Sequence, residues 1–207
     1  MSSTIVKFGL LPVKRTVFFL CDIQEKFRNV SQHFDSVVQS ANKLLRASKI
    51  LDIPLVVTEQ YPTGLGPTVS ELEINHAIGV FPKTKFSMMT PEVTVQLDSL
   101  CEGNVLCVVL FGLETHVCIE QTAAELCALG LKVHVVADAS TSRSQEDRLL
   151  AFQRLQQIGC FITTSESVLF KLLGDKENPK FKEIAALVKT PTQPSGLVTK
   201  LSDGVFV

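Results

Sequence analysis

The sequence carries almost no net charge, with 20 Lys and Arg residues set against 21 Asp and Glu residues and a pI near 6.4. Proteins that hold nucleic acid or an anionic membrane surface by electrostatic attraction have an excess of basic residues, which this chain lacks. The apolar runs also fall short of the ~20 residues that a transmembrane helix needs. We therefore expect neither a nucleic-acid partner nor attachment to a membrane.

The sequence also lacks the residue spacings that mark metal and nucleotide sites. Its six cysteines lie in or beside apolar runs without paired spacing, which is typical of reduced thiols in an intracellular protein. The four histidines are scattered, without the spacing of metal ligands. The first strand expected in the chain runs into Asp22, Ile23 and Gln24 instead of a glycine-rich dinucleotide fingerprint. We expect no cofactor and no bound metal.

No secretory signal is recognisable near the start of the chain, and we expect a cytoplasmic protein. Residues 1–21 contain Lys7, Lys14 and Arg15 but no acidic residue. This composition leaves a mitochondrial transit peptide open as an alternative. We favour the interpretation that residues 1–13 are a short basic lead into the first strand.

Strand-like and helix-like segments alternate along the chain. Apolar runs typical of buried strands occupy residues 16–21, 54–58, 78–81, 104–111, 132–137 and 160–164. Apolar residues at helical spacing occupy 37–51, 93–100 and 115–129, and further helices are expected after Ser144 and after the capping box at 163–166. The alternation predicts an α/β protein with a single-domain, doubly wound, Rossmann-like parallel sheet of about six strands and helices on both faces.

The length of the chain suits one such domain. With 207 residues, of which 45% are hydrophobic, the chain has enough apolar surface for an ample core. We place the domain at residues 14–189. Residues 190–207 include Pro191, Pro194 and Gly196 and show no helical period, so we interpret them as a C-terminal tail.

Cys118 is the strongest candidate for a catalytic residue. The apolar strand at 104–111 runs into a turn that contains Gly112, and Cys118 follows near the start of the next predicted helix. A thiol beside the free N–H groups of a helix N-terminus feels the positive end of the helix dipole, which favours the nucleophilic thiolate. The alternative is an inert core residue, because buried free cysteines are common.

Two further candidates stand at the ends of other predicted strands. Asp22 follows the strand at 16–21, and Lys83 follows the strand at 78–81. Ligands of open α/β sheets bind beyond the carboxyl ends of the strands, where a carboxylate can accept a proton from a thiol. The alternatives are a capping or turn role for Asp22 and a solvated loop position for Lys83. His116 does not join this set, because residues two apart on a helix do not face each other.

The segments around these candidates form a pattern. They read Asp-Ile-Gln-Glu-Lys-Phe at 22–27, Lys-Thr-Lys-Phe-Ser at 83–87 and Gly-Leu-Glu-Thr-His-Val-Cys-Ile at 112–119. In this order and spacing they resemble the isochorismatase-like cysteine hydrolases, a family that includes nicotinamidases and N-carbamoyl amidohydrolases. Further similar stretches lie at 58–66, 135–144 and 179–184. The resemblance extends over residues 14–189 and is closest to the isochorismatase domain-containing proteins of eukaryotes.

The resemblance implies a catalytic triad of Asp22, Lys83 and Cys118. It also implies an oxyanion hole formed by the backbone N–H groups of Glu114 and Cys118, with a cis peptide bond before Glu114. Lys83 is preferred to Lys85 because the family pattern is a lysine, two residues, an aromatic residue and a serine. The expected partner is a small-molecule substrate.

Four residues that follow strand ends, Gln24, Phe27, Gln60 and Tyr61, are candidates for substrate binding. The same region also departs from one branch of the family. In nicotinamidases the strand before it leads into an Asp-x-His metal motif, whereas this chain has Glu59, Gln60 and Tyr61. The departure argues against a zinc-dependent nicotinamidase.

Three functions stay open from the sequence. The favoured one is a cofactor-free cysteine hydrolase that cleaves the C–N bond of a small amide or N-carbamoyl substrate through a thioester. The second is isochorismatase-type vinyl ether hydrolysis, a reaction that can proceed by acid catalysis without the cysteine, so the presence of Cys118 counts against it. The third is a non-catalytic binding or scaffold protein on the same fold.

A homo-oligomer, either a dimer or a tetramer, is expected because the family is frequently oligomeric. The chain ends in the apolar residues Val205, Phe206 and Val207, which would be poorly placed in water. We therefore expect the tail to pack on its own subunit or on a neighbouring one.

Overall fold

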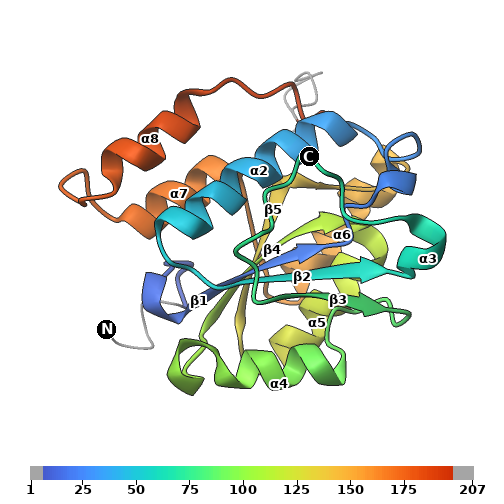
Figure 1. The fold of residues 1–207 in the computed structure, drawn as a ribbon, viewed down its shortest axis with the longest axis horizontal. Helices are drawn as coiled ribbons and strands as arrows, with labels where there is room; N and C mark the ends of the chain where they lie inside the picture. The colour runs from blue at the N-terminus through green and yellow to red at the C-terminus, as the bar shows by residue number, and fades with distance from the viewer. Residues whose placement is uncertain (1–6, 198–207) are drawn as a thin grey trace.

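The computed structural model describes residues 7–197, which contain one six-stranded parallel sheet in the order β3-β2-β1-β4-β5-β6 (Figure 1). The strands are β1 (Thr16–Cys21), β2 (Leu55–Gln60), β3 (Gly79–Lys83), β4 (Cys107–Leu113), β5 (Lys132–Thr141) and β6 (Phe161–Thr163). The chain builds the sheet outward from β1 to one edge and from β4 to the other. The predicted doubly wound α/β fold is confirmed, and its topological switch point lies between β1 and β4.

Helices cover both faces of the sheet. They are α2 (Phe34–Ile50), α3 (Pro62–Leu65), α4 (Pro91–Ser99), α5 (Glu120–Ala128), α6 (Gln145–Gln157), α7 (Ser165–Leu173) and α8 (Phe181–Lys189). Buried side chains of α2, α7 and α8 form one core with the sheet, and those of α4, α5 and α6 form the other. Figure 1 shows α2, α7 and α8 on one side of the sheet and α4 and α5 on the opposite side. Within residues 7–197, no helix combines the length and the apolar composition that crossing a bilayer requires.

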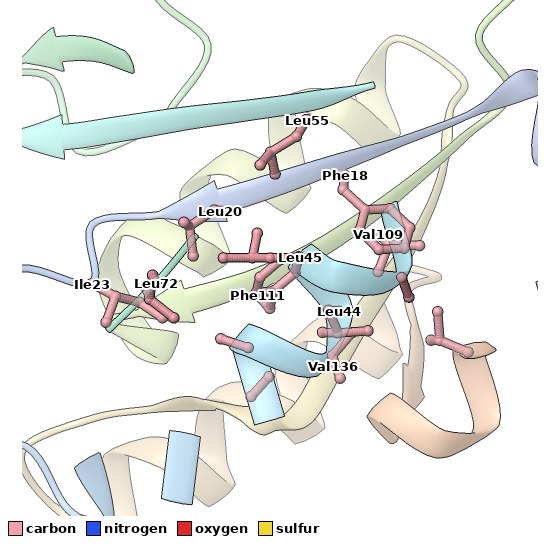
Figure 2. Close-up of a cluster of buried hydrophobic side chains, with 14 of the residues drawn as sticks. Phe18, Leu20, Ile23, Leu44, Leu45, Leu55, Leu72, Val109, Phe111 and Val136 are labelled. Carbon is pink, nitrogen blue, oxygen red and sulfur yellow. The ribbon is translucent and has the colours of Figure 1, made fainter. Parts of the chain in front are cut away.

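Alternate residues of β1 supply the two cores. Phe18 and Leu20 belong to the cluster that also contains Leu44 and Leu45 of α2 (Figure 2). The residues between them point to the opposite face of the sheet. All positions of β1 are buried, which explains why its sequence is apolar from Val17 to Cys21 instead of alternating between apolar and polar residues.

Most elements differ from their predicted bounds by a few residues, and three of these differences bear on the candidate site. β3 continues through Pro82 to Lys83, because it is an edge strand, where a missing proline N–H costs no sheet hydrogen bond. β5 continues to Thr141 and pairs with the end of β4 beyond an irregularity near Gly112. The helix predicted from residue 115 begins with a π-helical turn, Thr115–Ile119, and α5 follows it. Such π turns are frequent at functional sites.

Gly112 allows the end of β4 to lie very close to β1. Its φ of 128° is a conformation that residues with a side chain disfavour. A Cβ atom at this position would lie 2.0 Å from the carbonyl oxygen of Cys21. The glycine therefore places the turn that carries Cys118 directly beside the end of β1.

The described part of the C-terminal tail, residues 190–197, packs on its own chain. The carbonyl of Gln193 accepts a hydrogen bond of 2.8 Å from Ser36 of α2. Arg148 of α6 is fully buried and donates to the carbonyl of Ser195 at 2.6 Å, and it also donates to two carbonyls of β5. The tail is thereby joined to both α2 and the sheet, whereas the apolar end at 205–207 lies outside the described residues.

Acid should destabilise the fold through His134. This residue of β5 is fully buried and its ring stacks on Phe161 with centroids 4.8 Å apart. Neither ring nitrogen has a hydrogen-bond partner among the described residues. Burial lowers the pKa of His134 from 6.5 to about 4, and the positive charge of Lys171 adds to the decrease.

Because the folded state holds His134 neutral while the unfolded state binds a proton, the free energy of unfolding should decrease as the pH falls from about 6.5 to about 4. The total decrease expected from this residue is about 3 kcal/mol. Urea unfolding at a series of pH values would measure it. The variant His134→Leu should lose most of this dependence, whereas His33→Gln should keep it; equal acid sensitivity of His134→Leu and the parent protein would contradict the prediction.

Candidate active site

The three predicted catalytic side chains come from the carboxyl ends of three strands. Asp22 follows β1, Lys83 is the last residue of β3, and Cys118 lies in the π turn after β4. Because β2 separates β3 from β1, Lys83 reaches past the end of β2 to meet Asp22. The topology thus brings together residues that are far apart in the sequence, and all three side chains lie where the strands have their carboxyl ends.

Lys83 and Asp22 form a buried ion pair. The Nζ atom of Lys83 lies 2.6 Å from Oδ2 of Asp22, and the two side chains are 0% and 1% exposed, respectively. The other carboxylate oxygen, Oδ1, accepts a hydrogen bond of 2.8 Å from the hydroxyl of Thr58. Such pairing offsets the cost of removing both charges from water. The alternative of a solvated loop position for Lys83 is wrong.

Protein acceptors take up the ammonium hydrogens of Lys83. Besides Asp22, the group donates to Oε1 of Gln60 at 2.6 Å and to the carbonyls of Phe86 and Lys85 at 2.8 and 3.2 Å. Burial by itself lowers the pKa of Lys83, but the negative charges around it and its hydrogen bond to Asp22 outweigh burial, so the pKa is raised. Lys83 is therefore a fixed positive charge at neutral pH.

Cys118 lies against this ion pair. Its Sγ atom is 3.8 Å from Nζ of Lys83. One polar atom each of Cys21, Asp22 and Cys118 lies within 4.8 Å of the other two. The thiol is almost completely buried, with 6% of the residue exposed. A thiol, a carboxylate and an ammonium group are thus held close together, and the sulfur and a carboxylate oxygen must approach to hydrogen-bond distance before a proton can pass between them.

The peptide bond between Leu113 and Glu114 is cis, as the resemblance implies. Glu114 precedes the π turn, and its carbonyl accepts hydrogen bonds from the backbone N–H groups of Val117 and Ile119. Glu114 and Cys118 therefore belong to the same short turn. The role of their N–H groups as an oxyanion hole stays a prediction.

The side-chain amides of Gln24 and Gln60 form hydrogen bonds with other groups of the protein. Gln24 is fully buried; its nitrogen donates to the carbonyls of Gln60 and Gly66 at 3.0 and 2.7 Å, and its oxygen accepts from the backbone N–H of Gln60 at 2.7 Å. The amide of Gln60 binds Lys83 and the carbonyl of Thr84. These bonds fix the loop after β2 and orient the lysine, and contact of either glutamine with a substrate stays a prediction.

The two aromatic candidates differ in exposure. Phe27 is only 9% exposed and packs in the core cluster beneath α2, whereas Tyr61 is 57% exposed. Tyr61 also has a positive φ of 38°, which turns the chain sharply at the end of β2. The side chain of Tyr61 is therefore available to a ligand, and that of Phe27 mainly supports the core.

Sequence reasoning missed three residues of this site. Thr58 binds Asp22, and its position opposite Cys21 in the pairing of β1 with β2 depends on the strand register. Burial raises the pKa of Cys21 well above its usual value, and its hydrogen bond with Cys118 and the charge of Asp22 raise it further. Thr122 donates to the carbonyl of Cys118 at 2.6 Å. Polar residues at the ends of buried strands were the available signal for Thr58, and the spacing of four residues from Cys118 was the available signal for Thr122. Only the long-range contact with Cys118 brings Cys21 into the site.

A transition metal does not fit this site well. Cys21, Asp22 and Cys118 have suitable donor atoms close together. However, the ammonium of Lys83 already binds Asp22 and lies beside Cys118, so a divalent cation would meet a buried positive charge. Glu59, which stands where nicotinamidases begin their metal motif, accepts two hydrogen bonds from Thr68 instead.

Comparison with known proteins identifies the family. A family model described as the isochorismatase domain matches residues 16–167. The chain belongs to the isochorismatase family. Isochorismatase domain-containing protein 1 of Danio rerio is 50% identical over 197 residues, which cover 95% of this chain and 69% of that protein.

Solved structures of isochorismatase-like proteins have the same fold as this chain. The MAR1 ribonuclease of Caenorhabditis elegans has a TM-score of 0.86 and 41% identity, and the match covers 92% of this chain and 98% of that one. YcaC of Escherichia coli, described as an octameric hydrolase of unknown specificity, has a TM-score of 0.78 and 23% identity, and the match covers 86% of this chain and 89% of that one. At that identity, YcaC supports the fold alone.

Proposed function

We propose that this member of the isochorismatase family is a cofactor-free cysteine hydrolase that cleaves the C–N bond of a small amide or N-carbamoyl compound. The observation that carries the proposal is the contact of the Cys118 thiol with the buried Asp22–Lys83 pair. A merely structural cysteine does not require a buried ion pair beside it, because burying two charges is costly.

Cys118 acts as the nucleophile. Asp22 accepts the thiol proton, and the sulfur attacks the carbonyl carbon to give a tetrahedral intermediate. Asp22 then donates that proton to the nitrogen of the leaving group, the C–N bond breaks, and a thioester remains on Cys118. In the second half, Asp22 removes a proton from water, the hydroxide attacks the thioester, and the thiol leaves with the proton that Asp22 returns. N–H groups of Glu114 and Cys118 stabilise the oxyanion, at about 2.7–4 kcal/mol per donor in measured cases.

Lys83 contributes charge and does not itself transfer a proton. With its hydrogens directed at protein acceptors and its pKa raised, it stays an ammonium throughout the reaction. Its charge stabilises the thiolate that forms on Cys118 during the reaction, and its hydrogen bond holds the side chain of Asp22 in place. Gln60 holds Lys83 in this position through the bond of 2.6 Å.

The rival functions have less support from the site. Vinyl ether hydrolysis by acid catalysis requires Asp22 but gives Cys118 and Lys83 no clear task. RNA cleavage, which the name of the Caenorhabditis elegans relative suggests, requires cations free to bind phosphate. Lys83 has no such freedom, because its ammonium is buried and bound to the protein.

A substrate screen with ammonia release as the readout tests the proposal. Amides and N-carbamoyl compounds would be assayed with the parent protein, with Cys118→Ala and with Cys101→Ala, which removes a half-buried cysteine that contacts Thr16 at the start of β1, away from Asp22. We expect at least one substrate whose turnover is lost in Cys118→Ala and kept in Cys101→Ala. RNA cleavage or vinyl ether hydrolysis that survives in Cys118→Ala would refute the C–N hydrolase assignment.

We also propose that the protein forms a homo-oligomer. The octameric state of YcaC shows that this fold supports assembly. Exposed apolar side chains on and beside edge strand β3, among them Ile78 and Val80, offer a surface for a second copy. Light scattering at micromolar concentration is expected to give a dimer or a larger multiple of 22.7 kDa. A monomeric mass would contradict the proposal.

A further inference from the structure

A second pair of thiols lies outside the candidate active site. The Sγ atoms of Cys127 and Cys160 are 3.7 Å apart. Cys127 is in the last turn of α5, and Cys160 lies in the connection between α6 and β6. Cys127 is partly exposed, and Cys160 is 5% exposed. The two cysteines are therefore neighbours in space, and one of them is open to reagents in solvent.

The pKa values of the two thiols shift in opposite directions. Its hydrogen bond with Cys160 lowers the pKa of Cys127 to about 7, against the effect of burial, and the positive charge of Lys132 lowers it further. The same hydrogen bond raises the pKa of Cys160, and burial adds to the increase. At neutral pH these shifts favour the thiolate form of Cys127 and the protonated form of Cys160. A partly exposed thiolate next to a protonated thiol is the arrangement of a redox-active dithiol.

A glycine that lies in open space stands near each of the two cysteines. A disulfide requires the sulfurs to move from 3.7 Å to about 2.05 Å. Gly130 follows Cys127 closely and Gly159 precedes Cys160, and an added Cβ at either glycine would meet no atom within 4 Å. Both glycines allow the connections at these helix ends to adjust, and the approach falls mainly to the partly exposed Cys127, because Cys160 itself packs in the core cluster that α4, α5 and α6 form with the sheet.

We propose that Cys127 and Cys160 form a reversible thiol–disulfide modification site that reacts with hydroperoxides. The Cys127 thiolate attacks the terminal oxygen of the hydroperoxide, the O–O bond breaks, and with one proton the products are a Cys127 sulfenic acid and an alcohol or water. The Cys160 sulfur then attacks the Cys127 sulfur, its proton leaves with the hydroxyl as water, and the S–S bond forms. Two thiols are thereby oxidised by two electrons and one peroxide is reduced. Reaction with an external dithiol restores the reduced pair.

The site is independent of the proposed hydrolase function, since none of its residues belongs to the Asp22–Lys83–Cys118 set. A disulfide between Cys127 and Cys160 would close a long loop and tie the end of α5 to the start of β6. Such a crosslink restricts the unfolded chain. The oxidised protein is therefore expected to unfold at a Tm several degrees above that of the reduced protein.

Peptide mapping without reduction tests the proposal. The full-length reduced protein would be treated with hydrogen peroxide at a small molar excess, quenched, digested and analysed by mass spectrometry. We expect a crosslinked pair of peptides containing Cys127 and Cys160, two hydrogen masses lighter than their sum, that separates on treatment with dithiothreitol. A crosslink between any other two cysteines, or oxidation of Cys127 to sulfinic acid without a crosslink, would overturn the proposal.

Two variants distinguish the attacking from the resolving thiol. In Cys160→Ser, dimedone should trap a sulfenic acid at Cys127, because the second step is blocked. In Cys127→Ser, which changes a partly exposed position, Cys160 should stay unoxidised and the increase in Tm on peroxide treatment should disappear. The matched control Cys101→Ser should form the crosslink like the parent protein. Equal oxidation of Cys160 with and without Cys127 would contradict the assigned order of steps.

Discussion

Asp22→Asn is expected to lower turnover by about 10²–10⁴-fold, which is the usual contribution of a general acid–base group. The amide is nearly the same size as the carboxylate but can neither accept the thiol proton nor protonate the leaving amine. Thr58 can still donate to the remaining oxygen, so the local geometry is largely retained. The measurement is steady-state hydrolysis of an amide found in the screen, with ammonia as the readout.

Two controls make this result specific. Asp98→Asn changes an exposed aspartate of α4 and should leave turnover unchanged. Because Asp22→Asn leaves the buried Lys83 without its counter-ion, thermal unfolding of each variant must be recorded as well. If the single variant is poorly folded, Asp22→Asn combined with Lys83→Met removes both charges of the pair. Full activity of a folded protein without the carboxylate would refute the proposed role of Asp22.

Gly112→Ala is expected to lower the free energy of unfolding by roughly 4–5 kcal/mol or more. A loss of this size is exceptional for one substitution. The new Cβ would lie 2.0 Å from the carbonyl oxygen of Cys21, in backbone that cannot move without separating β4 from β1. The φ of 128° adds a conformational cost. Little soluble protein, or a large decrease in the urea midpoint, is the expected observation.

Gly130→Ala is the matched control. Gly130 also has a positive φ, 82°, but an added Cβ there meets no atom within 4 Å. Only the conformational cost of about 1–2 kcal/mol should therefore appear. The difference between the two variants isolates the effect of the contact between β4 and β1. Similar urea midpoints for both would show that the strands can separate without cost.

The sequence predicted the layers of the fold well, because strands buried on both faces leave a clear signal. β1 is apolar from Val17 to Cys21 and was predicted with its observed bounds. The extension of β3 to Lys83 was not predicted, because a proline argues against a strand unless the strand is known to be at an edge. The burial of Arg148 was also missed, since its partners are carbonyls of β5 and of the tail, which only the folded chain brings near.

The candidate site was predicted through its strand ends and through the family resemblance. A single lysine in a loop-like segment gives no local sign that it will be buried, and local sequence favoured a surface position for Lys83. Lys83 is buried because of contacts that join the ends of β1, β2 and β3. These contacts link residues far apart in the sequence, and the spacing of apolar residues carries no information about them. The amides of Gln24 and Gln60 show the same limit, because a glutamine after a strand can bind either a ligand or the backbone of a neighbouring loop.

Alkylation of individual cysteines by iodoacetamide at neutral pH tests the central claim most directly, because it needs no substrate. The parent protein, Lys83→Ala and Lys85→Ala would be compared by mass spectrometry, with folding checked by circular dichroism. Lys85 is a matched control, since it is two residues away and pairs with Glu125 at the surface instead of with Asp22. We predict fast labelling of Cys118 that slows at least about tenfold in Lys83→Ala and is unchanged in Lys85→Ala, with Cys127 labelled equally in all three. Slow labelling of Cys118 in the folded parent protein, unaffected by Lys83→Ala, would contradict the account and leave the chain as a non-catalytic member of its family.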